Sequence, residues 1–360
     1  EIQSCDVLII GGGMVGLSIA NQLLEKNNNL NIIVIDKESD LGKHSSGRNS
    51  GVLHAGIYYK PGSLKAKVCV EGARKLKAWA LKRDLPINPC GKIIVPQKSS
   101  LDNQLDLLAE RGPSNGADVE IWNEKQLKEF MPEARSSTGR ALWSPNTVVV
   151  KPLKILNTLK RELQLKGVKI LTSKDGVGRW IAEPENQKIL FNNDKSIKYS
   201  LLINCAGLHA DKIAQMFNIG NQYRLLPFKG IYWQIKKNSG LKLKSNLYPV
   251  PDLNVPFLGV HFTPSADKEP IVSIGPTATP ALGRENYKSF QSIEPLSAIE
   301  NLCLLSKQYL KNNLGFRKYA HEQLLLALLP FMLKSAQKLV PSLRAKDIEA
   351  SEKVGIRSQL

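Results

Sequence analysis

The stretch DVLIIGGGMVGLSIANQLLEKNNNLNIIVID, residues 6–36, predicts a β–α–β unit that binds a dinucleotide. The apolar run before the glycines is typical of a parallel strand that is covered on both faces. Gly11, Gly13 and Gly16 fit the pattern G-x-G-x-x-G, which permits a sharp turn, close approach of a pyrophosphate and close packing of the helix. That helix directs its N-terminal N–H groups at the phosphates. Asp36 ends the second strand, where a carboxylate binds ribose hydroxyls and disfavours the extra phosphate of NADP.

The segment after the second strand favours FAD over NAD. A unit that binds NAD continues into another helix and strand, whereas residues 41–67 read LGKHSSGRNSGVLHAGIYYKPGSLKAK and are rich in Gly, Ser, Arg and His. Such a loop permits close backbone approach and can follow a long cofactor from its pyrophosphate to its ring. We therefore expect FAD to be bound by Gly11, Gly13, Gly16, Asp36, Lys37, Ser45, Ser46, Arg48, Asn49, Ser50, Val177, Ala206 and Gly207.

Composition restricts the class of protein. A chain of 360 residues with 42% hydrophobic residues is long enough for two domains. The formal net charge of +18 favours anionic partners such as acidic substrates or anionic lipid, although the lysine-rich composition of the whole chain explains part of it. We expect no nucleic-acid partner, because no matching motif occurs. The 5 cysteines form no Cys-x-x-Cys pair, so we expect neither disulfides nor a metal site.

Several blocks resemble one flavoenzyme family. The block SSGRNSGVLHAGIYYKPGSLKAKVCVEGARKL is similar to the L-2-hydroxyglutarate oxidase/dehydrogenase family of the D-amino-acid-oxidase-like superfamily. Further blocks follow in the same order: CGKIIVP, INCAGLHADKIA, PFKGIYW, LYPVPDLNVPFLGVHFTP, IGPTATPALGRENY and VPSLRAKDI…GIRSQ. The resemblance covers nearly the whole chain. It implies FAD as cofactor and oxidation of the CH–OH group of L-2-hydroxyglutarate to give 2-oxoglutarate, with quinone or oxygen as the electron acceptor.

The resemblance also implies two interleaved domains in a mixed α/β (α+β) fold. We expect a Rossmann-like FAD-binding domain with a parallel sheet from residues 1–85, 147–221 and 288–360. We expect a substrate-binding domain with an antiparallel sheet from residues 86–146 and 222–287. Family members continue after a segment like GIRSQ with a strand, a turn and a closing helix, and this chain stops at Leu360. We therefore expect weakened FAD binding and a partly uncovered first sheet.

Two histidines are candidates for the catalytic base, because the pKa of histidine lies near neutrality. His54 lies in the loop next to the cofactor, and His261 lies in the apolar run FLGVHFTP. We expect both to face the flavin ring, one as the base and the other as a hydrogen-bond partner of the substrate. The alternative is that either is a hydrogen-bonded core histidine. His44, His209 and His321 lie near the pyrophosphate, at a helix start and in a solvated helix, respectively.

A dicarboxylate substrate needs cations and hydroxyl donors. Arginine can bind a carboxylate through two parallel hydrogen bonds. We expect the substrate to be bound by Tyr59, Lys229, Tyr248, Arg284 and Arg357. The alternative for each is a structural or surface pair.

Two other functions remain open from the residues alone. The chain can be an FAD oxidoreductase of another 2-hydroxy acid or of an amino acid. It can also be a basic, membrane-associated protein that kept the fold and lost catalysis, since residues 296–346 form a lysine-rich helical region with an apolar strip. No charged-then-apolar leader precedes the first strand, and we expect the protein in the cytoplasm or peripherally on the cytoplasmic face of the inner membrane.

Overall fold

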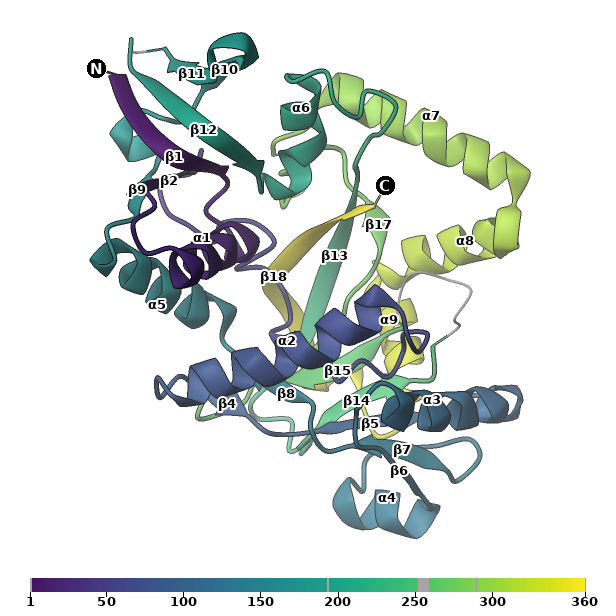
Figure 1. Ribbon diagram of the computed structural model, residues 1–360. Helices are drawn as coiled ribbons and strands as arrows, with labels where there is room; N and C mark the ends of the chain where they lie inside the picture. The colour runs from purple at the N-terminus through teal and green to yellow at the C-terminus, as the bar shows by residue number, and fades with distance from the viewer. Residues whose placement is uncertain (1, 193, 252–258, 289–290, 360) are drawn as a thin grey trace.

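The computed structural model describes residues 2–192, 194–251, 259–288 and 291–359, which form two large sheets with helices around them (Figure 1). Residues 252–258, which belong to the block LYPVPDLNVPFLGVHFTP, lie outside the described residues. One sheet is mainly parallel and the other is mainly antiparallel. The predicted mixed α/β class is therefore confirmed.

The parallel sheet has the order β10-β11-β12-β1-β2-β9. Its parallel strands are β1 (Ile2–Ile10), β2 (Ile32–Ile35), β9 (Lys169–Leu171) and β12 (Ser196–Asn204). The strands β10 (Trp180–Glu183) and β11 (Lys188–Phe191) extend it in antiparallel register. Because β1, β2 and β12 run in parallel, their carboxyl ends meet at one edge, where nucleotides bind in such sheets.

Helices α1 (Met14–Lys26) and α5 (Pro152–Leu165) cover one face of this sheet. Leu17 and Leu24 of α1 pack with Leu156 and Leu163 of α5 over the apolar side chains of β1 and β2. Burial of such leucines contributes about 1.5–3 kcal/mol per side chain. The short helix α6 (Ala210–Gln215) follows β12. The β–α–β unit predicted from the glycines is therefore present.

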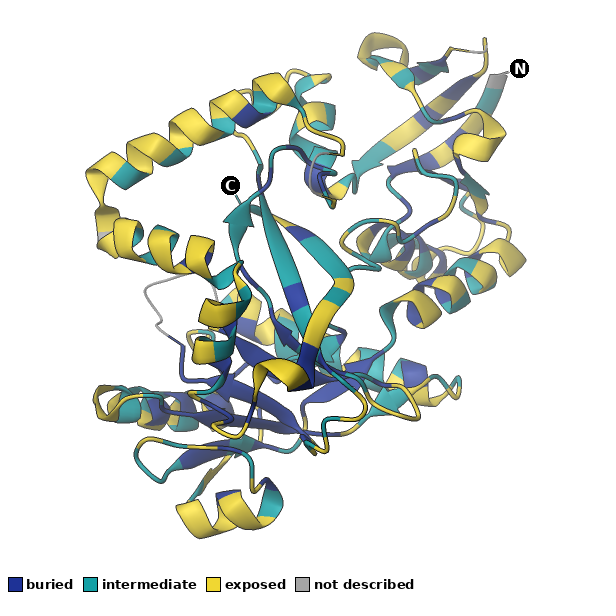
Figure 2. Cartoon of the chain, turned by 180° about the vertical axis from the view of Figure 1, so that it is seen from behind, coloured by how far each residue is buried: buried dark blue, intermediate teal, exposed yellow. Residues whose placement is uncertain are grey.

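The second sheet contains nine strands, which come from distant parts of the described chain. They are β5 (Lys92–Val95), β6 (Glu120–Trp122), β7 (Ala141–Ser144), β13 (Leu226–Ile235), β14 (Asn246–Pro249), β15 (His261–Pro264), β16 (Val272–Gly275), β17 (Thr279–Pro280) and β18 (Ile348–Gln359). Helices α3 (Asp102–Ser114) and α4 (Glu124–Phe130) pack beside it. Figure 2 shows that its central strands are largely buried.

Two elements within residues 288–360, which we expected in the FAD-binding domain, pack on the antiparallel sheet. Strand β18 pairs with β13 from Leu226↔Gln359 to Ile235↔Ile348, so it belongs to the antiparallel sheet. Helix α9 (Leu329–Ala336) inserts Met332 into the core of that sheet. The long-range pairing of β13 with β18 leaves no local pattern in the sequence.

Two further parts connect the sheets. Strands β3 (Val52–Leu53), β8 (Val148–Val150) and β4 (Ile87–Asn88) form a small sheet. Helix α2 (Leu64–Leu81) crosses in front of the nine-stranded sheet (Figure 1).

Helices α7 (Pro295–Lys311) and α8 (Phe316–Leu326) form an arm whose surface is mostly exposed (Figure 2). Among the described residues, no helix combines the length and apolar character needed to cross a membrane.

Candidate functional site

A groove of 530 Å³ lies at the carboxyl ends of β1, β2 and β12. It collects most of the residues that the sequence predicted for the cofactor. The predicted residues that line it are Gly11, Gly13, Asp36, Lys37, Ser45, Ser46, Val177, Ala206 and Gly207. Gly16 lies below the groove, where an added Cβ atom would stand 2.1 Å from the carbonyl oxygen of Gly11. Its role is therefore the close packing of α1 on β1.

Gly11 is required by two separate constraints. Its φ of +105° is a conformation that residues with a side chain rarely adopt, and a Cβ atom would stand 2.3 Å from the carbonyl oxygen of Cys205. The turn after β1 is thus pressed against the end of β12. This contact forms the floor of the groove.

Asp36 and Ser46 are held by the backbone of the glycine turn. The Asp36 carboxylate accepts hydrogen bonds from the N–H groups of Gly12 (2.9 Å) and Glu38 (2.9 Å). The Ser46 hydroxyl accepts a hydrogen bond from the N–H group of Met14 (2.9 Å), at the start of α1. The two side chains are therefore positioned where a ribose and a phosphate would approach the turn.

A charged cluster closes one side of the groove. The ammonium group of Lys37 contacts the carboxylates of Glu38 (2.6 Å) and Glu285, and Nε2 of His209 lies 2.9 Å from Glu285. Hydrogen bonds from His209 and then Lys37 lower the pKa of Glu285 to about 2. Glu38, His44 and Glu285 lie close enough to hold a metal ion. The ammonium group of Lys37 already supplies the positive charge there.

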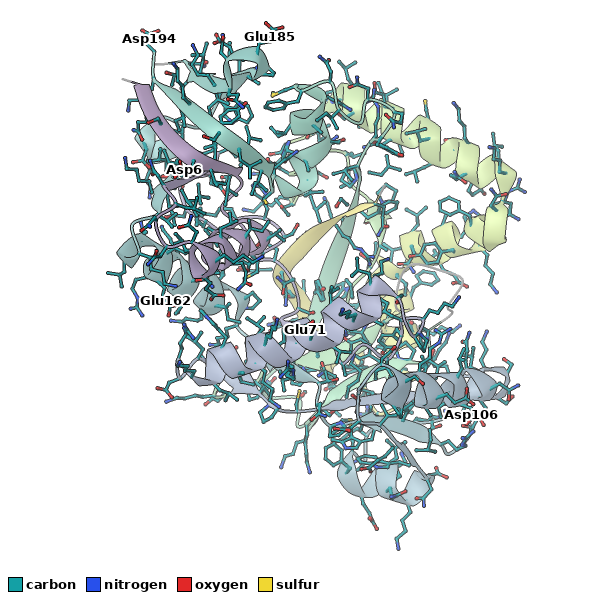
Figure 3. All side chains as sticks on the ribbon, in the orientation of Figure 1. Asp6, Glu71, Asp106, Glu162, Glu185 and Asp194 are labelled. Carbon is teal, nitrogen blue, oxygen red and sulfur yellow. The ribbon has the colours of Figure 1, made fainter. Side chains whose placement is uncertain are left out.

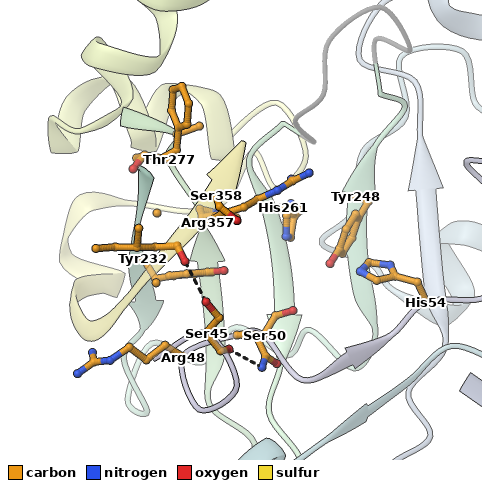
Figure 4. A pocket seen from close by; sticks show the side chains of 17 residues that line it. Ser45, Arg48, Ser50, His54, Tyr232, Tyr248, His261, Thr277, Arg357 and Ser358 are labelled. Carbon is orange, nitrogen blue, oxygen red and sulfur yellow. Dashed lines mark hydrogen bonds between the residues drawn. The ribbon is translucent and has the colours of Figure 1, made fainter. Parts of the chain in front are cut away.

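A second cavity of 480 Å³ adjoins the groove, and Ser45 lines both hollows. Its lining includes Ser45, Arg48, Asn49, Ser50, His54, Tyr232, Tyr248, His261, Thr277 and Arg357 (Figure 4). The described lining contains arginine and histidine but no carboxylate. Acidic residues such as Asp106 and Glu162 lie instead at the periphery of the molecule (Figure 3). The cavity is therefore suited to an anion.

The two predicted histidines lie on one wall of this cavity, on either side of Tyr248 (Figure 4). The rings of His261 and Tyr248 are stacked at 3.9 Å between centroids, and the ring of His54 meets Tyr248 edge-on at 6.4 Å. Nδ1 of His261 lies 2.8 Å from the carbonyl oxygen of Gly259. The structure thus brings two residues separated by 207 positions to one cavity, and that they face the flavin ring stays a prediction.

Burial controls the charge of this wall. It lowers the pKa of His261 to about 4, and the positive charge of Lys92 acts in the same direction. Burial, followed by the charge of Lys92, also lowers the pKa of His54 well below its ordinary value. Both imidazoles are therefore neutral at pH 7 and can accept or donate a proton.

Only some of the predicted substrate ligands line the cavity. Tyr248 and Arg357 line the cavity, but Arg284, Lys229 and Tyr59 do not. The Arg284 guanidinium is buried and forms two hydrogen bonds of 2.5 and 2.8 Å with Asp211. The ammonium group of Lys229 donates to the Asn286 side chain at 2.8 Å.

These contacts give Arg284 and Lys229 partners within the protein, whereas the role of Tyr59 stays a prediction. Arg284 was mistaken for a substrate ligand because its partner, Asp211, lies 73 positions away in a segment that carries no sign of the pairing. Lys229 is likewise held by a side-chain partner 57 positions away. Tyr59 lies on the loop next to the cavity but outside its lining.

Lys92 and Tyr232 are the main residues that sequence reasoning missed. Tyr232 lines the cavity, and Lys92 is fully buried behind His54, with Nζ 2.9 Å from Nδ1. The only signal was a lysine at the start of the apolar run KIIV. A lysine at the end of a strand is usually exposed, so this signal is weak.

We predict that Arg284→Met lowers stability and leaves the KM for substrate unchanged. Removing one partner of a buried ion pair costs about 3–5 kcal/mol, because the other charge stays buried without compensation. Adding Asp211→Leu should recover part of this loss. Urea unfolding and steady-state kinetics test both variants. A raised KM at unchanged stability would return Arg284 to the substrate site.

Comparisons with known proteins agree with this geometry. A family model described as "FAD dependent oxidoreductase" matches residues 6–360. The chain is 35% identical over 371 residues to "L-2-hydroxyglutarate dehydrogenase, mitochondrial" of Caenorhabditis briggsae, covering 100% of this chain and 82% of that protein. Identity to the human protein of the same name is 33%, covering 99% and 78%. Identity to "L-2-hydroxyglutarate dehydrogenase" of Indibacter alkaliphilus is 33%, covering 98% and 87%.

Solved structures share the fold at lower identity. L-alpha-glycerophosphate oxidase of Mycoplasma pneumoniae, with FAD bound, superimposes with a TM-score of 0.73 at 22% identity, covering 99% of this chain and 83% of that one. Glycine oxidase of Geobacillus kaustophilus gives 0.70 at 15% identity, covering 99% and 83%. The predictions of FAD as cofactor and of an oxidoreductase are confirmed. The chain belongs to the L-2-hydroxyglutarate dehydrogenase family of FAD-dependent oxidoreductases.

Proposed function

We propose that this chain oxidises L-2-hydroxyglutarate to 2-oxoglutarate in the 480 Å³ cavity. The observation that carries the proposal is the cavity wall, which combines neutral histidines with arginines and, among the described lining residues, has no carboxylate. This lining attracts a dicarboxylate and leaves the ammonium group of an amino acid without an anionic partner. It therefore favours a 2-hydroxy acid over an amino acid as substrate.

The groove would hold FAD through the residues that line it. Gly11 and Gly13 bring the backbone close to the pyrophosphate, the carboxylate of Asp36 accepts hydrogen bonds from ribose, and Ser45 and Ser46 continue toward the cavity. At Gly207 no atom lies within 4 Å of the place of an added Cβ, so there is room above the backbone. When bound, FAD supplies the acceptor for a hydride from the carbinol carbon.

The chain's own groups would handle the proton and the carboxylates. A neutral imidazole of His54 or His261 takes the hydroxyl proton, and the two negative charges of the substrate raise the pKa of the imidazole that receives it. Arg357 binds one carboxylate from the cavity wall. Arg48 is held by the carbonyl oxygens of Lys43 (2.6 Å) and Val354 (3.3 Å), so it supplies positive charge at a fixed position.

We predict that the FAD-loaded enzyme reduces an artificial dye with L-2-hydroxyglutarate, and that His54→Ala and His261→Ala each lower kcat. General acid–base catalysis contributes roughly 10²–10⁴-fold, so the variant that lacks the base should lose activity within this range. The D enantiomer, L-lactate and L-glutamate serve as comparison substrates. Faster turnover of L-glutamate, or wild-type kcat in both variants, would refute the assignment.

We predict that Arg357→Met raises the KM for L-2-hydroxyglutarate by about 10–100-fold, because a charge-assisted hydrogen bond contributes about 1.5–3 kcal/mol. The FAD content should stay at the wild-type level. Arg344→Met, at an exposed arginine outside the cavity lining, is the matched control. Equal loss of FAD and of substrate affinity would show that Arg357 supports the fold instead.

Quinone or oxygen would receive the electrons, and we propose that the arm of α7 and α8 brings the enzyme to an anionic membrane. Apolar side chains exposed on this arm include Leu296, Ile299, Leu310 and Leu324. Exposed cationic residues lie beside them: Lys307, Lys311, Arg317 and Lys318. Such a surface gains both apolar burial and electrostatic attraction at an anionic interface.

Co-sedimentation with vesicles tests the membrane proposal. The wild type should bind vesicles that contain anionic lipid and release at high salt, because polybasic attraction is screened. Leu296→Ser with Leu310→Ser should weaken binding and leave dye reduction unchanged. Equal binding of both proteins would rule out the arm. The prediction of a cytoplasmic location stays a prediction, and the names of the animal relatives include "mitochondrial".

A further inference from the structure

Lys92 is a buried cation in an unusual position. Its side chain has no exposed surface, and its Nζ atom lies 4.4 Å from the ring centroid of Tyr248 and 5.1 Å from that of Tyr58. Within the described part of the chain, no salt bridge reaches it. Its hydrogen-bond partner is Nδ1 of His54, at 2.9 Å. A buried lysine without a carboxylate is costly, so a role at the site explains its position better than packing does.

The contact with Lys92 determines which nitrogen of His54 carries the proton. An ammonium group only donates hydrogen bonds, so Nδ1 of His54 must accept. A neutral imidazole carries its proton on the other nitrogen, and Nε2 of His54 is then an N–H donor. His54 in this form can donate a hydrogen bond to the substrate but cannot take its proton.

The opposite assignment holds for His261. Its Nδ1 lies 2.8 Å from the carbonyl oxygen of Gly259, and a carbonyl oxygen only accepts. Nδ1 of His261 therefore carries the proton, and its Nε2 has a free lone pair. Among the described residues, no hydrogen bond engages Nε2 of either ring. Since both residues line the same cavity, one offers a donor there and the other offers a base.

We propose that Lys92 is a positioning residue that divides the roles of the two histidines, so that His54 binds the substrate through Nε2–H and His261 is the base through Nε2. The inference rests on the proposed function. In the reaction, the hydroxyl proton goes to Nε2 of His261. FAD bound in the groove would supply the acceptor for the carbinol hydrogen and its electron pair, so that the C–O single bond becomes the C=O bond of the 2-oxo acid.

The proposal implies a pH dependence. The titratable groups that face Lys92 are His54, His261, Tyr58, Tyr248, Cys69 and Cys90. Burial lowers the pKa of Lys92 to about 7, so the ammonium form that constrains His54 is lost as pH rises through this value. The pKa of His261 is about 4, so the base is lost as pH falls through this value. In free enzyme, kcat/KM should therefore be highest between these limits.

Nuclear magnetic resonance of protein labelled with ¹⁵N-histidine tests the protonation pattern directly, because protonated and unprotonated ring nitrogens differ in shift. Single substitutions assign the signals of the 5 histidines. At pH 6, the FAD-loaded wild type should show Nε2–H in His54 and Nδ1–H in His261. In Lys92→Met, the His54 signals should change, whereas His261 should keep Nδ1–H, because the carbonyl oxygen of Gly259 still accepts from it. Nδ1–H in wild-type His54, or unchanged His54 signals in the variant, would overturn the proposal.

Kinetics provides the second readout. Lys92→Met should lower kcat at least about tenfold at unchanged FAD content, and should remove the alkaline limb of the kcat/KM profile. His54→Gln keeps an N–H donor and should lose less activity than His261→Gln, which removes the base. Ile93→Val is the matched control, since it perturbs the core side of the same strand without touching either histidine, and should keep the wild-type pH profile. The reverse order of the two glutamine variants would overturn the proposal.

The two readouts separate this proposal from the proposed function. If L-2-hydroxyglutarate were not the substrate, turnover would be absent in every variant, and the protonation pattern would still be measurable in the wild type. The predicted pattern would then support the role of Lys92 in positioning His54. A wild-type enzyme that turned over L-2-hydroxyglutarate with the opposite pattern would refute the role of Lys92 alone.

Discussion

The contact between the loop at residues 45–50 and strand β18 holds the cofactor groove against the substrate cavity. An added Cβ atom at Gly355 would stand 2.7 Å from the carbonyl oxygen of Arg48, so only glycine permits this approach. The Ser45 hydroxyl donates to the carbonyl oxygen of Ile356, and the Arg48 guanidinium donates to that of Val354, each at 3.3 Å. The cofactor loop of one sheet is thereby fixed on a strand of the other. Ser45 lines both hollows because of this contact.

Charge distribution links this architecture to its chemistry. The groove side contains a cluster in which the ammonium group of Lys37 pairs with Glu38 and Glu285, and His209 lies within hydrogen-bond distance of Glu285. The described cavity lining contains cations and neutral histidines without carboxylates. A dianion entering the cavity therefore meets positive potential, and binding it makes protonation of an imidazole easier. In the proposed function, burial keeps His261 neutral until the substrate arrives, and the charge of the substrate stabilises its protonated form.

Local patterns predicted the parts of the site that lie close together in sequence. The glycine turn, Asp36 and the 45–50 loop follow one another along the chain, and each residue type has a specific geometric reason to be there. His54 and His261 were predicted from chemistry, because few residues can serve as a base near neutrality. The loop after Asp36 favoured FAD over NAD, the resemblance to a family implied FAD as well, and the comparisons confirm it.

The features of the site and fold that the sequence did not predict depend on contacts between segments that lie far apart in the chain. Arg284 has the right chemistry for a carboxylate, but Asp211 satisfies it within the protein. Lys92 contacts His54, 38 positions away, from a strand that pairs in parallel with β14, with Asn246 opposite Lys92 and Tyr248 opposite Ile94. Strand β18 joins the antiparallel sheet by pairing with β13 across more than a hundred residues. Such partners depend on topology, which a single sequence shows only where a local motif accompanies it.

In the proposed reaction, electrons pass from a substrate in the cavity to FAD in the adjoining groove. Anaerobic titration of the FAD-loaded protein with L-2-hydroxyglutarate tests it most directly, with the visible absorbance of the flavin as the readout. We expect the flavin to bleach in proportion to added substrate, with 2-oxoglutarate formed in equal amount. A flavin that stays oxidised at saturating substrate, while dithionite still reduces it, would show that the cavity and the groove do not work together in this reaction.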